Sequence, residues 1–206
     1  MHPNPAFRKG DTSSALDFAK QRGFGILSVN GSEGPMASHI PFYLSEDRTY
    51  IEAHLVRSNP IARVISEPTP ALLAVSGPHG YISPDWYGVE DQVPTWNYIA
   101  VHIRGTVQLL PQDQLPAHLD RLSDSFEERL SPKPIWKMDK VSDEALNKLM
   151  RMIVPTRFEI SQIDSTNKLA QNKPDEARIG AADGLETSTL GSELSTLAQL
   201  MREALD

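Results

Sequence analysis

The stretch Gln92-Val93-Pro94-Thr95-Trp96-Asn97-Tyr98-Ile99-Ala100-Val101-His102-Ile103-Arg104-Gly105 contains the strongest fold signal in the chain. From residue 95 onward, odd-numbered positions are mostly β-branched and apolar, whereas even-numbered positions carry Trp96, Tyr98, His102 and Arg104. Successive strand residues point to opposite faces of a sheet, so this alternation predicts a long strand over 95–110 with one face in a core. Two aromatic side chains with polar tips on the other face indicate that a flat ligand or another protein chain covers it.

Shorter apolar runs on either side of this stretch predict further strands. They lie over 23–29, 36–44, 49–56, 69–76 and 156–164, and the glycine-rich segment 30–34 is typical of a hairpin turn. Strands this apolar are best protected in a closed sheet, which has no exposed edge. The expected fold class is therefore mainly β: a six- or seven-stranded antiparallel barrel with peripheral helices.

Capping residues and helical spacing predict five helices outside the barrel. Asp11 to Ser14 and Gly23 bound the first, and Asn59 and Pro60 begin the second. The others are expected over 112–130, 145–152 and 193–205. The segment 77–88 is expected to begin as a bend and continue as a loop, and the polar, glycine-rich segment 174–192 is predicted to be a loop. These patterns divide the chain into a barrel domain, 1–175, and a loop with a C-terminal helix packed on it, 176–206.

Composition restricts the possible functions. The chain has 206 residues, no cysteine and a formal net charge of −7, so disulfides and thiolate chemistry are excluded. Neither a membrane-spanning apolar run nor a secretory signal is recognised, and the cytoplasm is the expected location. An acidic chain with no basic block and no helix-turn-helix pattern makes direct DNA binding doubtful. Motifs for dinucleotides, nucleoside triphosphates and serine hydrolysis are also missing.

Three groups of residues are candidates for a site. Arg57-Ser58-Asn59 precedes a predicted helix and combines a guanidinium, a hydroxyl and a helix start, which suits an anion, although an ordinary cap with a surface arginine gives the same pattern. His39, His54 and His102 lie on polar strand faces. We interpret them as hydrogen-bonded histidines rather than a metal site. The aromatic residues around 86–98 are either core residues or a stacking surface, and the sequence does not distinguish these.

Five motifs in order resemble the PaiB family of FMN-binding negative transcriptional regulators. They are Ser38-His39-Ile40-Pro41-Phe42, the segment 54–60 from His54 to Pro60, the segment 77–87, Val93-Pro94-Thr95-Trp96-Asn97-Tyr98 with His102, and Lys168-Leu169-Ala170-Gln171-Asn172-Lys173. The resemblance implies a split β-barrel related to the pyridoxamine-phosphate-oxidase fold. It also implies a homodimer that holds FMN in a groove between its subunits.

The same resemblance assigns expected roles. Arg57, Ser58 and Asn59 would hold the phosphate, and Ser38, His39 and Ile40 would line the edge of the isoalloxazine ring, with His54 in the same motif set. The groove would be closed by Trp96, Asn97, Tyr98 and His102, and by a segment carrying Lys168, Gln171 and Asn172. Lys173 replaces the arginine usual in this motif, and a lysine cannot make a bidentate contact.

Three functions remain open on the sequence. The first is an FMN-binding dimer acting as a flavin-dependent oxidoreductase or a flavin-linked regulator, because a bound flavin would supply electron chemistry. The second is a negative transcriptional regulator that acts without flavin chemistry. The third is a haem-binding split-barrel protein, which would need a histidine such as His39 or His102 as ligand. No residue identifies a proton donor, so whether the protein is an enzyme is left open.

Overall fold

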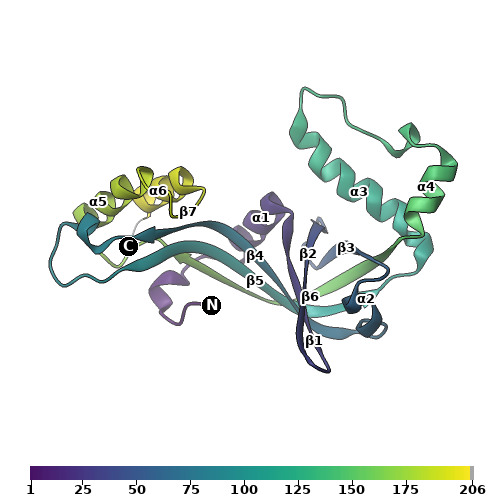
Figure 1. The fold of residues 1–206 in the computed structure, drawn as a ribbon, viewed down its shortest axis with the longest axis horizontal. Coiled ribbons are helices and arrows are strands. Elements are labelled where there is room, and N and C mark those ends of the chain that lie inside the picture. The colour runs from purple at the N-terminus through teal and green to yellow at the C-terminus, as the bar shows by residue number, and fades with distance from the viewer. Residues whose placement is uncertain (205–206) are drawn as a thin grey trace. The chain divides into compact units, whose positions relative to one another are not determined.

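The computed structural model describes residues 1–204; residues 205 and 206, including the expected helix residue Leu205, lie outside the described part. Seven strands form one sheet in the order β1-β2-β3-β6-β5-β4-β7, and β1 also pairs with β4, which closes six strands into a barrel (Figure 1). The strands are β1 (Phe24–Gly31), β2 (Gly34–Leu44), β3 (Tyr50–Val56), β4 (Thr69–Ile82), β5 (Thr95–Leu109), β6 (Ile153–Lys168) and β7 (Gly191–Ser192). The predicted mainly β split barrel with peripheral helices is confirmed.

Residues 1–204 contain six α-helices, of which the first precedes β1 and the others lie between or after the strands. They are α1 (Thr12–Arg22), α2 (Pro60–Val64), α3 (Leu115–Glu127), α4 (Asp143–Met150), α5 (Asp175–Glu186) and α6 (Leu194–Glu203). Short 3₁₀ turns include η1 (Pro5–Phe7), η2 (Pro84–Tyr87) and η3 (Gln112–Gln114), with η4 (Glu128–Leu130) and η5 (Met138–Lys140) after α3. Within residues 1–204, no helix is long and apolar enough to cross a membrane.

The chain divides into two compact units. One contains residues 1–17, 75–102 and 164 onward, and the other contains 18–74 and 103–163. Each of the long strands β4, β5 and β6 contributes residues to both units. We call them the first and the second unit. The domain boundary expected between residues 175 and 176 stays a prediction.

The second unit contains the hairpin strands β1 and β2, whose alternation follows the sequence. On β2, Ile40, Phe42 and Leu44 are buried, as predicted, and on β3 the buried apolar residues are Ile51, Ala53 and Leu55. These are the inward positions of strands with period two, because every second side chain faces the interior. Helix α3 lies against β2 and β3 and covers their outer face. One outward residue of β3 therefore becomes buried as well: Glu52 is only 1% exposed.

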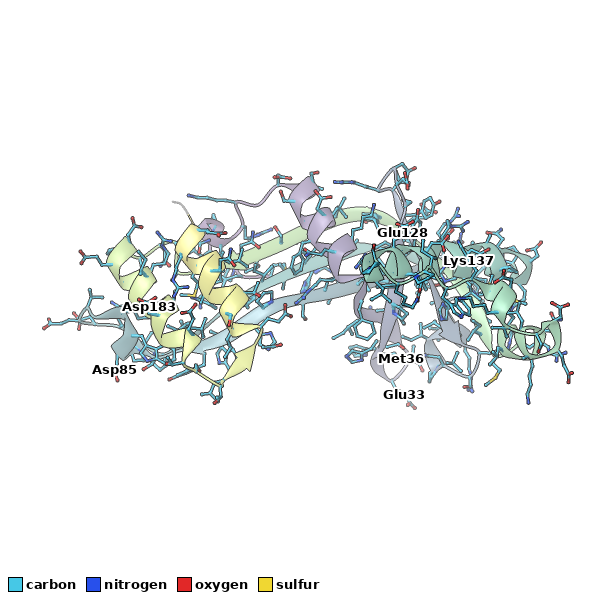
Figure 2. All side chains as sticks on the ribbon, turned by 90° about the horizontal axis from the view of Figure 1, so that it is seen from above. Glu33, Met36, Asp85, Glu128, Lys137 and Asp183 are labelled. Carbon is cyan, nitrogen blue, oxygen red and sulfur yellow. The ribbon has the colours of Figure 1, made fainter. Side chains whose placement is uncertain are left out.

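The first unit differs from expectation over 174–192, where the predicted loop is wrong and α5 forms instead. Its glycines are packing positions rather than breaks. A Cβ on Gly184 would lie 2.4 Å from the Trp86 ring, and one on Gly180 would lie 2.6 Å from the Trp86 carbonyl oxygen. Ala177, Ala181 and Leu185 fill the interface behind them. Figure 1 shows α5 and α6 side by side, and the labelled Asp183 in Figure 2 pairs with Arg202 of α6 at 2.6 Å.

The expected bend at residue 77 is also wrong, because β4 continues to Ile82. Its end is paired with β7, with His79 opposite Ser192 and Gly80 opposite Gly191. Gly80 permits this arrangement: a Cβ there would lie 2.8 Å from Leu185 and 2.9 Å from Leu194. The Gly-Pro pair at 77 and 78 signalled a turn in the local sequence, but pairing and helix packing, which are long-range, hold the strand extended.

Candidate functional site

A polar cluster in the second unit joins β2 to the start of α2. Asn59 caps α2, since its Oδ1 accepts a hydrogen bond from the Ile61 N–H at 2.9 Å, and Pro60 occupies the first helical position. The Asn59 Nδ2 donates to the Ser38 Oγ at 3.0 Å. Ser38 and Asn59, which the resemblance assigns to different parts of FMN, are therefore hydrogen-bonded to each other. Ser58, between Asn59 and Arg57, is exposed.

The Arg57 guanidinium is exposed but held in one orientation. Its Nε donates to the Arg151 carbonyl at 2.9 Å, and its Nη2 donates to Gln112 Oε1 at 2.8 Å and to the Ile153 carbonyl at 3.3 Å. A guanidinium has five N–H donors. The two on Nη1 make no hydrogen bond within residues 1–204, so a fixed cation presents two donors to an incoming acceptor.

The other two β2 candidates differ in accessibility. The His39 imidazole is exposed and stacks on Phe24 with ring centroids 6.2 Å apart. The Ile40 side chain lies in the barrel core, so only its backbone could contact a ligand. Both remain candidates, with the imidazole of His39 as the more available group.

His54 belongs to a row of polar side chains, His54, His118 and Glu52, that the sequence did not predict and that we call the relay. Its Nδ1 shares a 3.1 Å hydrogen bond with Nε2 of His118 on α3, and His118 Nδ1 lies 3.7 Å from Glu52 Oε2. Arg121 and Arg157 donate to Glu52 at 2.6 and 2.9 Å. The available signals were Glu52 and His54 sharing a strand face, and His118 and Arg121 at helical spacing.

Burial determines the charge state of this relay. It lowers the pKa of His118 to about 4, and the neighbouring His54 adds to this effect while Glu52 opposes it. Burial likewise lowers the pKa of His54. Burial raises the pKa of Glu52, but the hydrogen bonds from Arg121 and Arg157 outweigh it, and the net pKa is lowered. At neutral pH the relay therefore contains two neutral imidazoles and one carboxylate held between two guanidinium groups.

The aromatic candidates of β5 lie in the first unit. Trp96 is 46% exposed, and its ring centroid lies 6.0 Å from that of His79 and 6.3 Å from that of Tyr81. Trp96 and Tyr98 line a surface pocket of about 360 Å³ whose other residues are Ser76, Gly77, His79, Ile99 and Ala100. This volume lies in the range of pockets that take a drug-sized ligand, about 300–1,000 Å³. We call it the tryptophan pocket.

The sequence left open whether the tryptophans stack on a ligand or pack in a core. The structure separates them: Trp96 is open to solvent, whereas Trp86 packs against α5. His102 lies farther along β5 and is half-buried.

The remaining candidates line a second pocket of the first unit, with a volume of about 220 Å³. It brings together Asn97, Lys168 and Asn172, and it adds Lys173 and the rings of Phe7 and Tyr87. We call it the lysine pocket. Gln171 serves a different purpose: its Oε1 accepts from the Leu169 N–H at 2.8 Å, and its Nε2 donates to the carbonyls of Asn167 and Ala6. Gln171 thus fixes the loop that carries Asn172 and Lys173.

Comparison with known proteins identifies the class of this barrel. The family described as "Putative FMN-binding domain" matches residues 1–162, and the chain belongs to this family. FMN is thereby the cofactor of the domain. The chain is also 29% identical over 201 residues to the "Protease synthase and sporulation protein PAI 2" of Bacillus subtilis, covering 97% of this chain and 95% of that protein.

Two solved structures share the fold at low sequence identity. An "FAD and Heme binding protein" from Mycobacterium smegmatis has a TM-score of 0.59 at 17% identity, over 90% of this chain and 82% of that one. The "Flavocytochrome Anf3" from Azotobacter vinelandii has a TM-score of 0.58 at 14% identity, over 81% and 72% of the two chains. These two structures confirm the expected split-barrel fold, and the family match confirms the expected flavin binding.

Proposed function

We propose that this protein is an FMN-binding homodimer in which each flavin contacts both subunits. The cluster of Arg57, Ser58 and Asn59 would hold the phosphate, next to Ser38 and His39. Trp96 and Tyr98 of the partner subunit would cover the ring. The family match over residues 1–162 is the observation that carries FMN binding. The assignment of residues is supported by the chemistry of each group.

The phosphate end fits the donors that the second unit offers. Two N–H groups of the anchored Arg57, the exposed Ser58 hydroxyl and the Asn59 amide surround the start of α2. Charge-assisted hydrogen bonds to phosphate are the strongest that such side chains make. Because Arg57 is already held by three acceptors, little side-chain entropy is lost when phosphate binds.

The ring end fits the tryptophan pocket. A flat, conjugated ring prefers a broad aromatic face, and the exposed Trp96 indole with the neighbouring Tyr81 and His79 rings provides one. An indole left half-exposed on a strand is also typical of residues that anchor a subunit interface. A flavin covered by the second subunit would account for both the aromatic face and the half-exposed indole of Trp96.

The chain's contribution is binding and orientation. When bound, FMN supplies the electron-transfer chemistry itself. Arg57 would fix the phosphate end of FMN, and the aromatic face would fix the plane of its ring. Trp96 and Tyr98 would exclude water from the ring. We propose that this protein works as a flavin-dependent oxidoreductase or as a regulator that responds to flavin, and that its net charge of −7 disfavours direct operator binding.

Fluorescence titration of the flavin-free protein with FMN tests binding. We expect quenching of flavin fluorescence at one flavin per chain, since stacking on an indole quenches the ring. Arg57→Gln should weaken binding by about tenfold or more, because a charged hydrogen bond contributes about 1.5–3 kcal/mol. Lys148→Gln, an exposed change on α4, should leave affinity unchanged. Absence of saturable quenching in the wild-type protein would refute the proposal.

Mixing two defective variants tests whether each flavin contacts both subunits. Arg57→Gln removes only the phosphate contact, and Trp96→Ala removes only the aromatic side chain that covers the ring. If the two ends come from different subunits, each mixed dimer holds one intact site and one doubly damaged site. Binding at wild-type affinity should then return for half the sites of every mixed dimer. If both ends come from the same subunit, mixing restores nothing, and the two-subunit site is wrong even where FMN binding stands.

A further inference from the structure

The lysine pocket places two ammonium groups, those of Lys168 and Lys173, near one another. Lys168 Nζ donates to the Thr95 hydroxyl and, at 2.8 Å, to the Trp96 carbonyl, and Lys173 Nζ donates to Gln92 Oε1. Across residues 1–204, neither ammonium forms an ion pair. An ammonium has three N–H donors, so one remains on Lys168 and two on Lys173. The pocket therefore offers three donors and two charges to an acceptor.

The surroundings of the two lysines also favour the binding of an anion. Lys168 lies 6.0 Å from the centre of the Phe7 ring, and Lys173 lies 5.4 Å from that of Tyr87. Burial, with the charge of Lys173, lowers the pKa of Lys168. Two like charges are thus held near one another in a partly dry place, which is unfavourable until an anion enters.

Asp91 limits the charge of the ligand. Among the described residues it is the one carboxylate that lines the pocket, so this lining has two positive groups and one negative group. A net charge of about +1 suits a monoanion better than a phosphate carrying close to two charges at neutral pH. The pocket chemistry therefore favours a carboxylate.

The buried side chain of Asn97 indicates that the ligand carries a hydrogen-bond donor. Its side chain is 1% exposed, and its Nδ2 contacts the Met201 sulfur at 3.4 Å. Its Oδ1 is buried and accepts no hydrogen bond within the described residues. A buried acceptor without a partner is unfavourable, so a ligand hydroxyl or amine that donates to it would stabilise the complex.

Volume excludes a whole flavin mononucleotide from this pocket. The cavity of about 220 Å³ is smaller than the roughly 300–1,000 Å³ of pockets that enclose drug-sized ligands. Only a small molecule, or one end of a larger one, can lie inside.

We propose that the lysine pocket binds a small hydroxy- or amino-carboxylate, with Lys168 and Lys173 on the carboxylate and Asn97 on the ligand's hydroxyl or amine. This site goes beyond flavin binding and does not depend on it, because every residue that lines it belongs to the first unit. The flavin-free protein already contains the complete pocket. A substrate or an effector of the flavoprotein would be such a ligand.

Calorimetric titration of the flavin-free protein with lactate and with propionate tests the proposal. The two probes have the same carbon skeleton and charge, and only lactate carries the hydroxyl. We expect saturable lactate binding at one site and propionate binding weaker by about fivefold or more, since a hydrogen bond contributes about 1 kcal/mol. Lys168→Met and Lys173→Met should each weaken lactate by about tenfold. Lys148→Met, an exposed change on α4, is the matched control and should have no effect.

Four results would overturn the proposal. The first is no saturable lactate binding to the wild-type protein. The second is a lactate affinity equal to that of the wild type in both lysine variants, shown folded by near-ultraviolet circular dichroism. The third is inorganic phosphate binding more tightly than lactate, which removes the carboxylate class. The fourth is displacement of lactate by FMN, which makes the pocket part of the flavin site. Lys168→Arg keeps the charge and should retain binding. FMN titration of the same samples reports separately on the proposed function.

Discussion

The buried His54–His118–Glu52 relay should make the protein lose stability between neutral pH and about pH 5. His118 is fully buried and has a pKa of about 4, whereas a histidine in an unfolded chain titrates near pH 6.5. Between these values the unfolded chain binds a proton that the folded chain excludes, so the free energy of unfolding falls as the pH falls. Linkage over these two pKa values gives a loss of about 2 kcal/mol from about pH 7 to about pH 5.

Neighbouring groups affect this window in known directions. The pKa of His54 is also lowered by burial, so its protonation adds to the loss over the same range. Glu52 has a lowered pKa and contributes stability that is lost only at lower pH, below the ordinary carboxylate range. Arg121 and Arg157 keep their charge throughout and disfavour a protonated His118. His118 and His54 are therefore the groups of this relay whose protonation in the unfolded chain lowers stability between neutral pH and about pH 5.

Urea unfolding followed by tryptophan fluorescence at the two pH values measures the loss. His118→Gln keeps an amide within reach of His54 but removes the proton site, and we expect its loss to be less than half that of the wild type. His39→Gln removes an exposed histidine and should leave the wild-type loss unchanged. An equal pH dependence in the wild type and in His118→Gln would refute the reasoning, whatever the stability of either protein at neutral pH.

Three further predictions follow from single contacts. Glu52→Gln leaves two arginines around a neutral amide and should cost about 3 kcal/mol in urea unfolding, whereas Glu159→Gln at an exposed position should cost almost nothing. Asn59→Ala removes the cap of α2 and the bond to Ser38, so we expect a loss of about 1–2 kcal/mol and weaker FMN binding; an unchanged melting temperature would contradict this. Gly184→Ala places a Cβ against the Trp86 ring and should cost about 1–3 kcal/mol by thermal unfolding.

The strands of the barrel could be predicted because their burial follows a local rule. On β2 and β5 the buried residues alternate with others, and the sequence shows this alternation directly. The cap at Asn59 was likewise readable, since the residue types that start a helix are few and adjacent to one another. These features require only that a residue meet its near neighbours, so no knowledge of distant partners was needed.

Features that depend on distant partners were not predictable in the same way. Helix α5 has glycines that read as a loop until Trp86, almost a hundred residues earlier, is known to pack against them. The burial of Glu52 depends on Arg121 of α3 and Arg157 of β6. Lys173 is a second example. The sequence showed only that it replaces an arginine and cannot make a bidentate contact, whereas the structure shows that it lines one pocket with Lys168.

Local charge, rather than net charge, governs what this acidic protein can bind. At physiological ionic strength a surface charge is screened beyond about 8 Å, so the net charge of −7 acts weakly on an anion already inside a pocket. Lys168, Lys173 and the anchored Arg57 act at contact distance in partly dry surroundings, where each charge has more effect. Long DNA, by contrast, must approach the whole acidic surface and neutralise many phosphates together. The net negative charge is therefore compatible with the two proposed anion sites, although it disfavours binding to a promoter. Gel shifts with promoter DNA at low salt should accordingly show no complex at concentrations that saturate the flavin site.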